Sequence, residues 1–292
     1  MRIRLKYGLP VALLVVLPSL LSAQLGQPLD PNAPPPGDPR SPAALAILTQ
    51  SLAAMTPPGS TVVGSSITTL RASGTLEKRD SSGKWISGTF SYVDDLNTQQ
   101  PEYKRSIEWN GYKQQYWSNH GDPSSFNSAA NAGGKSGSAS VSNTQAEVTK
   151  MHNRRFEAQY LPYVLLYQAS TQSDVAVYQL GNVTIRGKSY LHLETLRSPQ
   201  AVYTKPTRRD WYIDAQTSLP YIAMELVYSK PSHDIAVLER TTYTAYQSQD
   251  GLLSPMEQAI AYNGIETVRL HLNKVETNTK IERSMFDAAA GN

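Results

Sequence analysis

The strongest constraint on the fold is a series of short segments in which apolar and polar residues alternate. Between residues 69 and 117 the alternation recurs in four segments, and turn-forming residues such as Asn110-Gly111 separate them. A period of two places every second side chain on the same face of a β-strand, and Asn-Gly is a strong hairpin signal. This part of the chain is therefore predicted to form four antiparallel strands at hairpin spacing.

The second half of the chain repeats the alternation, which raises the predicted total to about ten strands. Helical spacing occurs in only two places, which begin at Ser41-Pro42 and at Leu161-Pro162. The apolar stripe of the first helix is predicted to consist of Leu45, Leu48, Leu52 and Met55. A mainly β domain is therefore predicted, and a doubly wound α/β sheet is not, because that fold alternates strands with many helices.

Residues 1–23 have the order of a cleaved secretory signal. Three basic residues precede an apolar run at 9–21, and the small residues Ser22 and Ala23 follow it. The run is shorter than the roughly 20 residues that a spanning helix needs, and the alternative is an uncleaved membrane anchor. Cleavage is expected between Ala23 and Gln24. The signal predicts an exported protein, in the periplasm of a Gram-negative-type bacterium first and outside the cell second.

Charge and cysteine content exclude several classes of function. Three of the 27 Lys and Arg residues and none of the 24 Asp and Glu residues lie in segment 1–23, which leaves 24 of each sign in the mature chain. A chain without net charge gives no electrostatic reason to bind nucleic acid. The chain has no cysteine, which excludes a disulfide, a Cys-ligated zinc and a lipid-modified cysteine. The mature protein is not expected to be an integral membrane protein.

Composition divides the rest of the chain into a tether and one domain. Residues 24–40 are rich in proline and poor in large apolar residues, so they are predicted to form a disordered tether. Residues 41–292 are predicted to form a single β domain. Within it, segment 120–149 is dense in Ser, Gly, Ala and Asn and is predicted to be a flexible insertion.

The motifs that could carry catalysis are weak. Segment 129–136 resembles a phosphate-binding loop, but Ala129 replaces the first glycine and the neighbours are of low complexity. No two of the five histidines have metal-ligand spacing. Asp94-Asp95 could supply one carboxylate for hydrolysis, and nothing identifies a second. No catalytic residue, metal ligand or cofactor is assigned, and the alternative of an uncharacterised hydrolase stays open.

Three turn motifs, taken with the strand order, resemble the LolA-like family of envelope proteins. They are Trp109–Tyr112 leading to Tyr116-Trp117, the Asp-Ala-Gln-Thr-Ser-Leu-Pro turn at 214–220, and segment 250–255 followed by a strand, Asn278 and Phe286. The resemblance spans roughly residues 41–286 outside the insertion. It implies an incomplete β-barrel, which is an open curved antiparallel sheet covered by two or three short helices, with an apolar cavity between them. Members of this family carry lipoproteins or lipids across the periplasm, or sense envelope stress by binding such molecules.

The leading hypothesis is therefore a non-catalytic exported protein that binds an acyl chain, a lipid or a lipoprotein in an apolar cavity. Burial of an acyl chain contributes about 0.8 kcal/mol per CH₂. The alternative is an envelope sensor or protein-interaction module of the same fold that carries no ligand. The candidate lining residues are Phe90, Tyr92, Ile107, Trp109, Ile222, Met224, Leu226, Val268, Leu270 and Leu272. A shift of one residue would turn such side chains to the other face of the sheet.

Overall fold

A computed structural model of the chain describes residues 37–56, 67–95, 102–109, 112–119, 122–129, 161–197, 207–228 and 236–286. The expected leader, its cleavage position between Ala23 and Gln24, and residues 24–36 of the expected tether lie outside the described residues.

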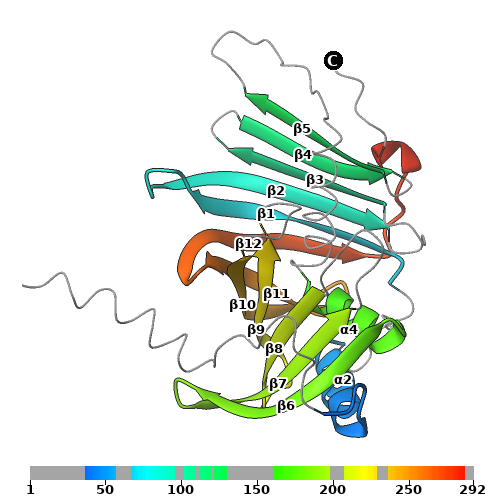
Figure 1. Cartoon of the computed structure of the whole chain (residues 1–292). Helices are drawn as coiled ribbons and strands as arrows, with labels where there is room; N and C mark the ends of the chain where they lie inside the picture. Colours follow the sequence, from blue (N-terminus) through cyan, green and yellow to red (C-terminus); the bar gives the residue numbers. More distant parts are fainter. Residues whose placement is uncertain are drawn as a thin grey trace, which may run out of the picture.

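The described residues form one twelve-stranded antiparallel sheet in the order β5-β4-β3-β2-β1-β12-β11-β10-β9-β8-β7-β6 (Figure 1). Its strands are β1 (Thr69–Arg79), β2 (Trp85–Asp95), β3 (Glu102–Trp109), β4 (Tyr112–Asn119), β5 (Asp122–Ala129), β6 (Val175–Ile185), β7 (Lys188–Arg197), β8 (Thr207–Asp214), β9 (Pro220–Tyr228), β10 (Ala236–Gln249), β11 (Leu252–Tyr262) and β12 (Ile265–Thr277). The sheet is not closed, because β5 and β6 lie at opposite edges. This confirms the predicted fold class, an open antiparallel sheet with few helices.

The sheet consists of two meanders that meet at its centre. Strands β1–β5 each pair with the next along the chain, as do β6–β12, and the two groups are joined where β1 pairs with β12. The register of this pair shifts at Ser73/Gly74, where a side chain at Gly74 would collide with the carbonyl oxygen of His271. Glycine therefore permits the close approach of the two backbones at this bulge.

The structure contains two strands that the alternation does not reveal. One is β5, which occupies the start of the expected insertion 120–149 and pairs with β4 through its backbone. The other is β11, where the polar residues Ser254 and Gln258 take buried positions. Backbone pairing requires no apolar side chain, so a polar strand can form without an apolar alternation.

Two helices lie against the second meander, where both contact β6 and the first also contacts β11 (Figure 1). They are α2 (Pro42–Met55) and α4 (Pro162–Thr171), and they contact each other. Ser41 begins α2 as predicted, since its hydroxyl oxygen accepts a hydrogen bond from the backbone N–H of Ala44 at 3.3 Å. The buried face of α2 is Ala44, Ile47, Leu48, Ser51 and Met55, with Leu45 and Leu52 partly buried beside it.

Arg40, at the end of the expected tether, ties both helices to the sheet. Its guanidinium donates hydrogen bonds to the carbonyl oxygens of Ala169 at 3.0 Å and Ser170 at 2.8 Å, near the end of α4, and to that of Val175 at 3.0 Å. Its backbone N–H donates to the carbonyl oxygen of Val177 at 2.7 Å. Arg40, at the expected boundary between tether and domain, is therefore held by hydrogen bonds to α4 and β6.

The two predicted turns in the second half form through side-chain acceptors. Asp214 Oδ1 accepts hydrogen bonds from the backbone N–H of Gln216 at 2.9 Å and of Thr217 at 3.0 Å. Asp250 has a positive φ of 49° and its Oδ2 accepts from the backbone N–H of Thr277 at 2.7 Å. Asp214 thus supplies the acceptor that its tight turn needs, whereas Asp250 joins the turn between β10 and β11 to the end of β12.

The last described residues return to the first strands of the sheet. Asn278 Oδ1 accepts a hydrogen bond from the backbone N–H of Thr68 at 2.8 Å, and the Asn278 backbone N–H donates to the carbonyl oxygen of Thr69 at 2.9 Å. The short helix η2 (Arg283–Phe286) then contacts β3 and β4, and its Phe286 is fully buried. The late asparagine and phenylalanine thus hold the chain end against the first meander.

Candidate functional site

The sheet has a helix-covered face, on which α2 and α4 lie, and an outer face on the opposite side. The first apolar cluster on the helix-covered face contains Ala44, Ile47, Leu48, Met55, Ile67, Tyr163, Leu166, Ala169, Val175, Val177, Leu193, Trp211, Ile213, Ala223, Tyr243 and Leu252. The second apolar cluster contains Leu70, Ala72, Leu76, Phe90, Tyr92, Leu161, Val164, Met256, Ile260, Leu270, Leu272 and Val275. Side chains at the start of α4 lie in both, so this helix connects the two clusters.

The structure brings seven of the ten predicted lining residues to the helix-covered face. Those that belong to the second apolar cluster or pack against it are Phe90, Tyr92, Ile107, Val268, Leu270 and Leu272. Trp109 lies on the same face and stacks with the ammonium group of Lys78, which is 5.2 Å from its ring centroid. Whether these residues line a ligand cavity stays a prediction.

The other three predicted lining residues are on β9 and lie on the outer face. Ile222 and Met224 belong to a separate apolar cluster with Ile185, Tyr190 and Tyr212, and Leu226 shares their alternation. Ala223 and Glu225 occupy the helix-covered face instead. Because residues 222 to 225 are all buried, the alternation in β9 does not reveal which face points toward the helices.

Three charged side chains form a buried row across β8, β9 and β10 on the helix-covered face. Arg209 is the register partner of Glu225, which is in turn the register partner of Glu239. The exposed fractions of these residues are only 9%, 6% and 4% respectively. Arg209 Nη2 donates to Glu225 Oε2 at 2.8 Å. We call these three residues the charged row.

The charged row has a buried oxygen without a hydrogen-bond partner. Glu225 Oε1 accepts no hydrogen bond within the described part of the chain, although Oε2 is bonded to Arg209. Burial lowers the pKa of Arg209, but the charge of Glu225, with Tyr243 and Glu239, outweighs it and leaves that pKa above its ordinary value. Arg209 therefore stays charged in the interior.

A second titratable cluster lies on the outer face of β7 and β8. His192 Nε2 is 2.8 Å from Asp210 Oδ1, and the His192 ring stacks on Tyr212 with ring centroids 4.5 Å apart. Glu194 is fully buried, and its Oε1 is 2.8 Å from Arg208 Nε. Burial, with the nearby charge of Asp210, raises the pKa of Glu194 to about 7, although Arg208 acts in the opposite direction.

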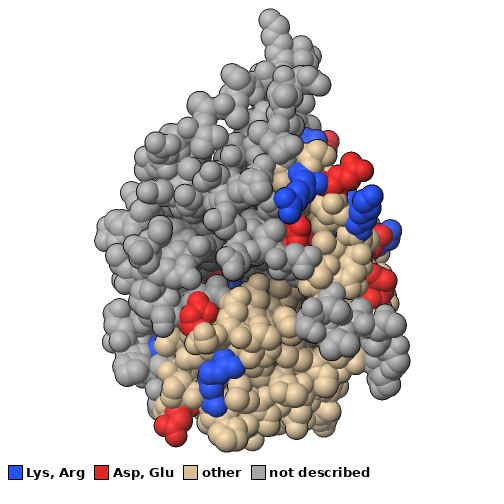
Figure 2. Space-filling view, turned by 90° about the vertical axis from the view of Figure 1, so that its right-hand side faces the viewer, with Lys and Arg blue, Asp and Glu red and all other residues tan. Residues whose placement is uncertain are grey.

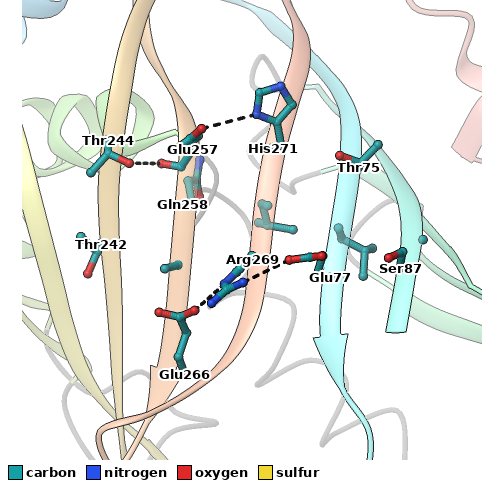
Figure 3. A pocket seen from close by; sticks show the side chains of 14 residues that line it. Thr75, Glu77, Ser87, Thr242, Thr244, Glu257, Gln258, Glu266, Arg269 and His271 are labelled. Atoms are coloured by element: carbon teal, nitrogen blue, oxygen red, sulfur yellow. Dashed lines mark hydrogen bonds and ion pairs between the residues drawn. The ribbon is translucent and has the colours of Figure 1, made fainter. Parts of the chain in front are cut away.

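A polar groove of about 690 Å³ crosses the outer face of β10, β11, β12, β1 and β2 (Figure 3). Arg269 contacts Glu266 at 2.6 Å and Glu77 at 3.4 Å, and His271 Nδ1 is 3.9 Å from Glu257 Oε1. Carboxylates, hydroxyls, an imidazole and a guanidinium therefore lie in this groove beside Leu76 and Leu270. Its lining does not suit an acyl chain, because desolvation of these polar groups would cost free energy that the chain cannot return.

The outer surface of the helices has the opposite character. Neither α2 nor α4 contains a charged residue. In Figure 2 the described part of the visible face has Lys and Arg side chains interspersed with Asp and Glu side chains. Within the described residues no helix is long and apolar enough to cross a membrane.

The remaining sequence candidates show no assembled catalytic or metal site. Asp94 is buried near the end of β2, and His271 is exposed in the groove. Residues 130–149 of the expected flexible insertion, which include most of the segment that resembles a phosphate-binding loop, and the histidines at 120, 152 and 233 lie outside the described residues. Among the residues that the structure describes, no three His, Asp or Glu side chains are grouped so that they could hold a metal ion. Sequence patterns do not single out the charged row, because Glu225 lies in the set of β9 positions opposite the predicted apolar lining.

Comparison with known proteins identifies relatives by fold and not by sequence. No protein-family model and no curated protein sequence matches the chain. A DUF1329 family protein from Desulfovibrio piger has a similar structure, with a TM-score of 0.50 at 13% identity, over 85% of this chain and 97% of that one. A LolA superfamily protein from Nitrosomonas europaea gives a TM-score of 0.45 at 10% identity, over 84% and 97% of the respective chains. The chain thus shares a fold with the first protein, and the LolA-like resemblance recurs as a weak likeness.

Proposed function

We propose that this protein binds the acyl chain of a lipid or a lipid-modified protein between the helix-covered face and helices α2 and α4. In this proposal the protein is not an enzyme, and the leader-like segment 1–23 exports it to the periplasm or beyond. The acyl chain would lie against the second apolar cluster, to which six of the predicted lining residues belong or pack.

The observation that carries the proposal is the extent of this apolar surface relative to its helical cover. The second apolar cluster spans β1, β2, β11 and β12, whereas the described helical side chains on it are only Leu161, Val164 and Leu165. A sheet surface larger than its helical cover offers apolar area to a flexible chain. Each CH₂ group that leaves water there stabilises the complex by about 0.8 kcal/mol.

The position of α4 supports the same function. Its Tyr163 and Leu166 lie in the first apolar cluster, whereas Val164 lies in the second. A small displacement of α4 would therefore separate the two clusters without breaking any strand pairing. A ligand could enter along this helix while the sheet stays intact.

The proposal is tested by blocking the apolar face with a large side chain. Ala72 is 4% exposed in the second apolar cluster, so Ala72→Trp would occupy the volume beside Leu70 and Tyr92. We expect protein purified natively from the envelope to carry about one lipid or acylated molecule per chain by native mass spectrometry, and Ala72→Trp to carry little. A wild-type protein that is consistently empty contradicts the proposal.

The matched control is Ala259→Trp, which adds the same side chain to the polar groove on the outer face. Because added bulk in a core commonly costs about 1–3 kcal/mol, thermal unfolding of both variants accompanies the binding measurement. Equal ligand occupancy in the two folded variants would contradict binding at the second apolar cluster.

The uncharged outer surface of α2 and α4 favours a second candidate function, which is docking of a partner protein by the same fold. Charged residues are depleted at the centre of protein interfaces, and neither helix contains one. If this candidate is correct, the wild-type protein carries no lipid and co-purifies with a partner protein in a one-to-one ratio. We expect Ala46→Glu on α2 to abolish binding of that partner.

A further inference from the structure

The short helix η2 contains the only half-buried methionine among the residues that the structure describes. This residue is Met285, whereas Met55, Met224 and Met256 are 0%, 5% and 3% exposed. The other two methionines, at positions 1 and 151, lie outside the described residues. An oxidant that reaches the described part of the folded chain therefore meets the Met285 thioether first.

The partner of this thioether is a guanidinium from β1. Arg71 Nη2 donates to Met285 Sδ at 3.3 Å, and this contact joins η2 to the first strand of the sheet. A thioether sulfur is only a weak acceptor. The Nε atom of the same guanidinium is buried and has no hydrogen-bond partner in the described part of the chain. Arg71 is therefore a charged donor whose neighbours satisfy it poorly.

The carboxylate opposite Arg71 does not meet this need. Glu276 on β12 is the register partner of Arg71, but its Oε1 lies 2.7 Å from Lys274 Nζ. A buried N–H group without an acceptor costs free energy, so such a group in a folded protein requires an explanation. An oxygen acceptor at the position of the Met285 sulfur would lower that cost.

We propose that Met285 is a reversible oxidation site, and that its sulfoxide holds η2 to β1 more firmly than the thioether does. The oxidant is a peroxide. The sulfur lone pair of Met285 attacks one oxygen of hydrogen peroxide and the O–O bond breaks; the proton of the transferred oxygen passes to the departing oxygen, which leaves as water. The sulfoxide oxygen then accepts a hydrogen bond from the Arg71 guanidinium, and bonds from a charged donor are about twice as strong as neutral ones. Methionine sulfoxide reductases restore the thioether.

The effect of oxidation at this site is opposite to its effect in an apolar core. In a core the sulfoxide buries a polar oxygen without a donor, which destabilises the fold. Met285 is half-buried and has a cation within hydrogen-bond reach, so its sulfoxide gains a partner. Oxidation therefore tightens the attachment of η2. This inference goes beyond the proposed function and does not depend on it, since Met285 belongs to neither apolar cluster.

Brief treatment of the folded protein with hydrogen peroxide tests the site. Methionine sulfoxide is then located by peptide mass mapping. We expect Met285 to oxidise at least about tenfold faster than Met55, Met224 and Met256, because susceptibility follows exposure. Equal rates at the four methionines overturn the inference.

Hydrogen exchange tests the attachment of η2. The Met285 backbone N–H donates to the carbonyl oxygen of Glu282 at 2.9 Å, so its exchange rate reports how often η2 opens. We expect exchange in residues 282–286 to be at least about threefold slower in the oxidised protein, and to recover after treatment with methionine sulfoxide reductases. Exchange that is unchanged or faster after oxidation of Met285 overturns the inference.

A pair of variants shows whether the guanidinium causes the effect. In Arg71→Leu no charged donor reaches the sulfoxide, so oxidation should no longer slow exchange in η2. The matched control is Arg79→Leu, which removes a guanidinium that stacks on Trp85 at the other end of β1, and it should keep the wild-type response. Slowing that survives in Arg71→Leu overturns the inference.

Variants of Met285 cover the case in which Arg71→Leu detaches η2 altogether. Met285→Gln supplies an amide carbonyl oxygen as acceptor without any oxidant, whereas Met285→Leu supplies no acceptor. We expect exchange in η2 to be slower in Met285→Gln than in the untreated wild type, and not to be slower in Met285→Leu. Neither variant should respond to peroxide. Equal exchange in the two variants overturns the inference and leaves the proposed function intact.

Discussion

At the residue scale, two charged side chains have effects that their positions in the sequence do not suggest. Arg40 stands at the end of a proline-rich segment, yet it bonds to carbonyl oxygens at the end of α4 and the start of β6. Glu194 alternates with apolar residues in β7, yet it is fully buried beside Asp210 and Arg208. One residue stabilises the helical cover, and the other makes stability depend on pH.

Substitution of Arg40 by Ala is expected to lower the free energy of unfolding by about 2 kcal/mol, since hydrogen bonds to charged groups contribute roughly 1.5–3 kcal/mol. The loss should appear in urea denaturation followed by tryptophan fluorescence. Lys280→Ala, which removes an exposed cation, serves as the control and should change stability little. Equal stability of both variants would show that the Arg40 hydrogen bonds do not hold α4.

Glu194 is expected to make the folded state more stable below neutral pH. Its pKa is about 7 in the folded protein and near 4.5 when unfolded, so between these values the folded state binds more protons. The stability that this group contributes is present below pH 4.5 and is lost as the pH rises through 7. Glu194→Gln should reduce the fall in unfolding free energy between pH 5 and pH 8, and should be more stable than the wild type at pH 8.

The control for this experiment is Glu257→Gln, which removes an exposed carboxylate and should keep the wild-type pH dependence. A Glu194→Gln variant with the same slope as the wild type would mean that Glu194 is ionised throughout the range. Urea denaturation at several pH values measures both slopes.

Sequence patterns could not identify the buried charges for a physical reason. Glu225 alternates with Ile222 and Met224, and apolar alternation assigns the apolar set to the interior. In β9 the side chains on both faces are buried, so alternation cannot distinguish a solvent-exposed face from a buried one. Turn chemistry was more informative at 214–220, because Asp214 acts locally and its hydrogen bonds follow from the sequence, whereas Asp250 bonds to the distant Thr277.

At the element scale, the junction between β1 and β12 depends on one glycine. A Cβ at Gly74 would meet the backbone of His271 and Leu272, and backbone atoms cannot move aside as a flexible side chain can. The sheet therefore brings its two meanders together at a point where only glycine fits.

Gly74→Ala is expected to destabilise the protein by about 3 kcal/mol, at the upper end of the range for overpacking. Thermal unfolding measures this effect, and Ser73→Ala at the adjacent position is the control. A Gly74→Ala protein as stable as the control would mean that the bulge relaxes without cost.

Elements with apolar alternation were predictable, and polar elements were not. Both helices begin where the proline and capping residues place them, and β1, β2 and β12 follow their apolar periods. β5 contains mostly small polar residues, and β11 contains Pro255 with polar residues at buried positions. These two strands are held by backbone pairing with adjacent strands, and a local pattern of apolar residues does not reveal that pairing.

At the scale of the whole molecule, the two meanders are joined by the pairing of β1 with β12, which are the first and last strands in the chain. Leu70 pairs with Thr277, so the central contact of the sheet joins the first strand to the last. Contacts of such long separation form late because loop closure costs entropy. We therefore expect the sheet to fold only after the second meander is complete.

Hydrogen exchange should reveal this architecture directly. The backbone amides of β1, β11 and β12, in the centre of the sheet, are expected to exchange most slowly, and those of the edge strand β5 most rapidly. The opposite edge strand, β6, contacts both helices and should exchange more slowly than β5. Equal exchange rates for β5 and β12 would contradict an open sheet with a stable centre.

The hydrogen bonds of Arg40 also give the contact between Arg40, α4 and β6 a mechanical consequence. A force applied to the chain at Gly37 would reach the described helices and strands first at Arg40, whose guanidinium and backbone N–H join α4 to β6. Tension would thus be delivered both to the end of α4, the helix that connects the two apolar clusters, and to the edge strand β6. A partner that held or pulled the N-terminal segment could therefore displace α4 from the apolar face.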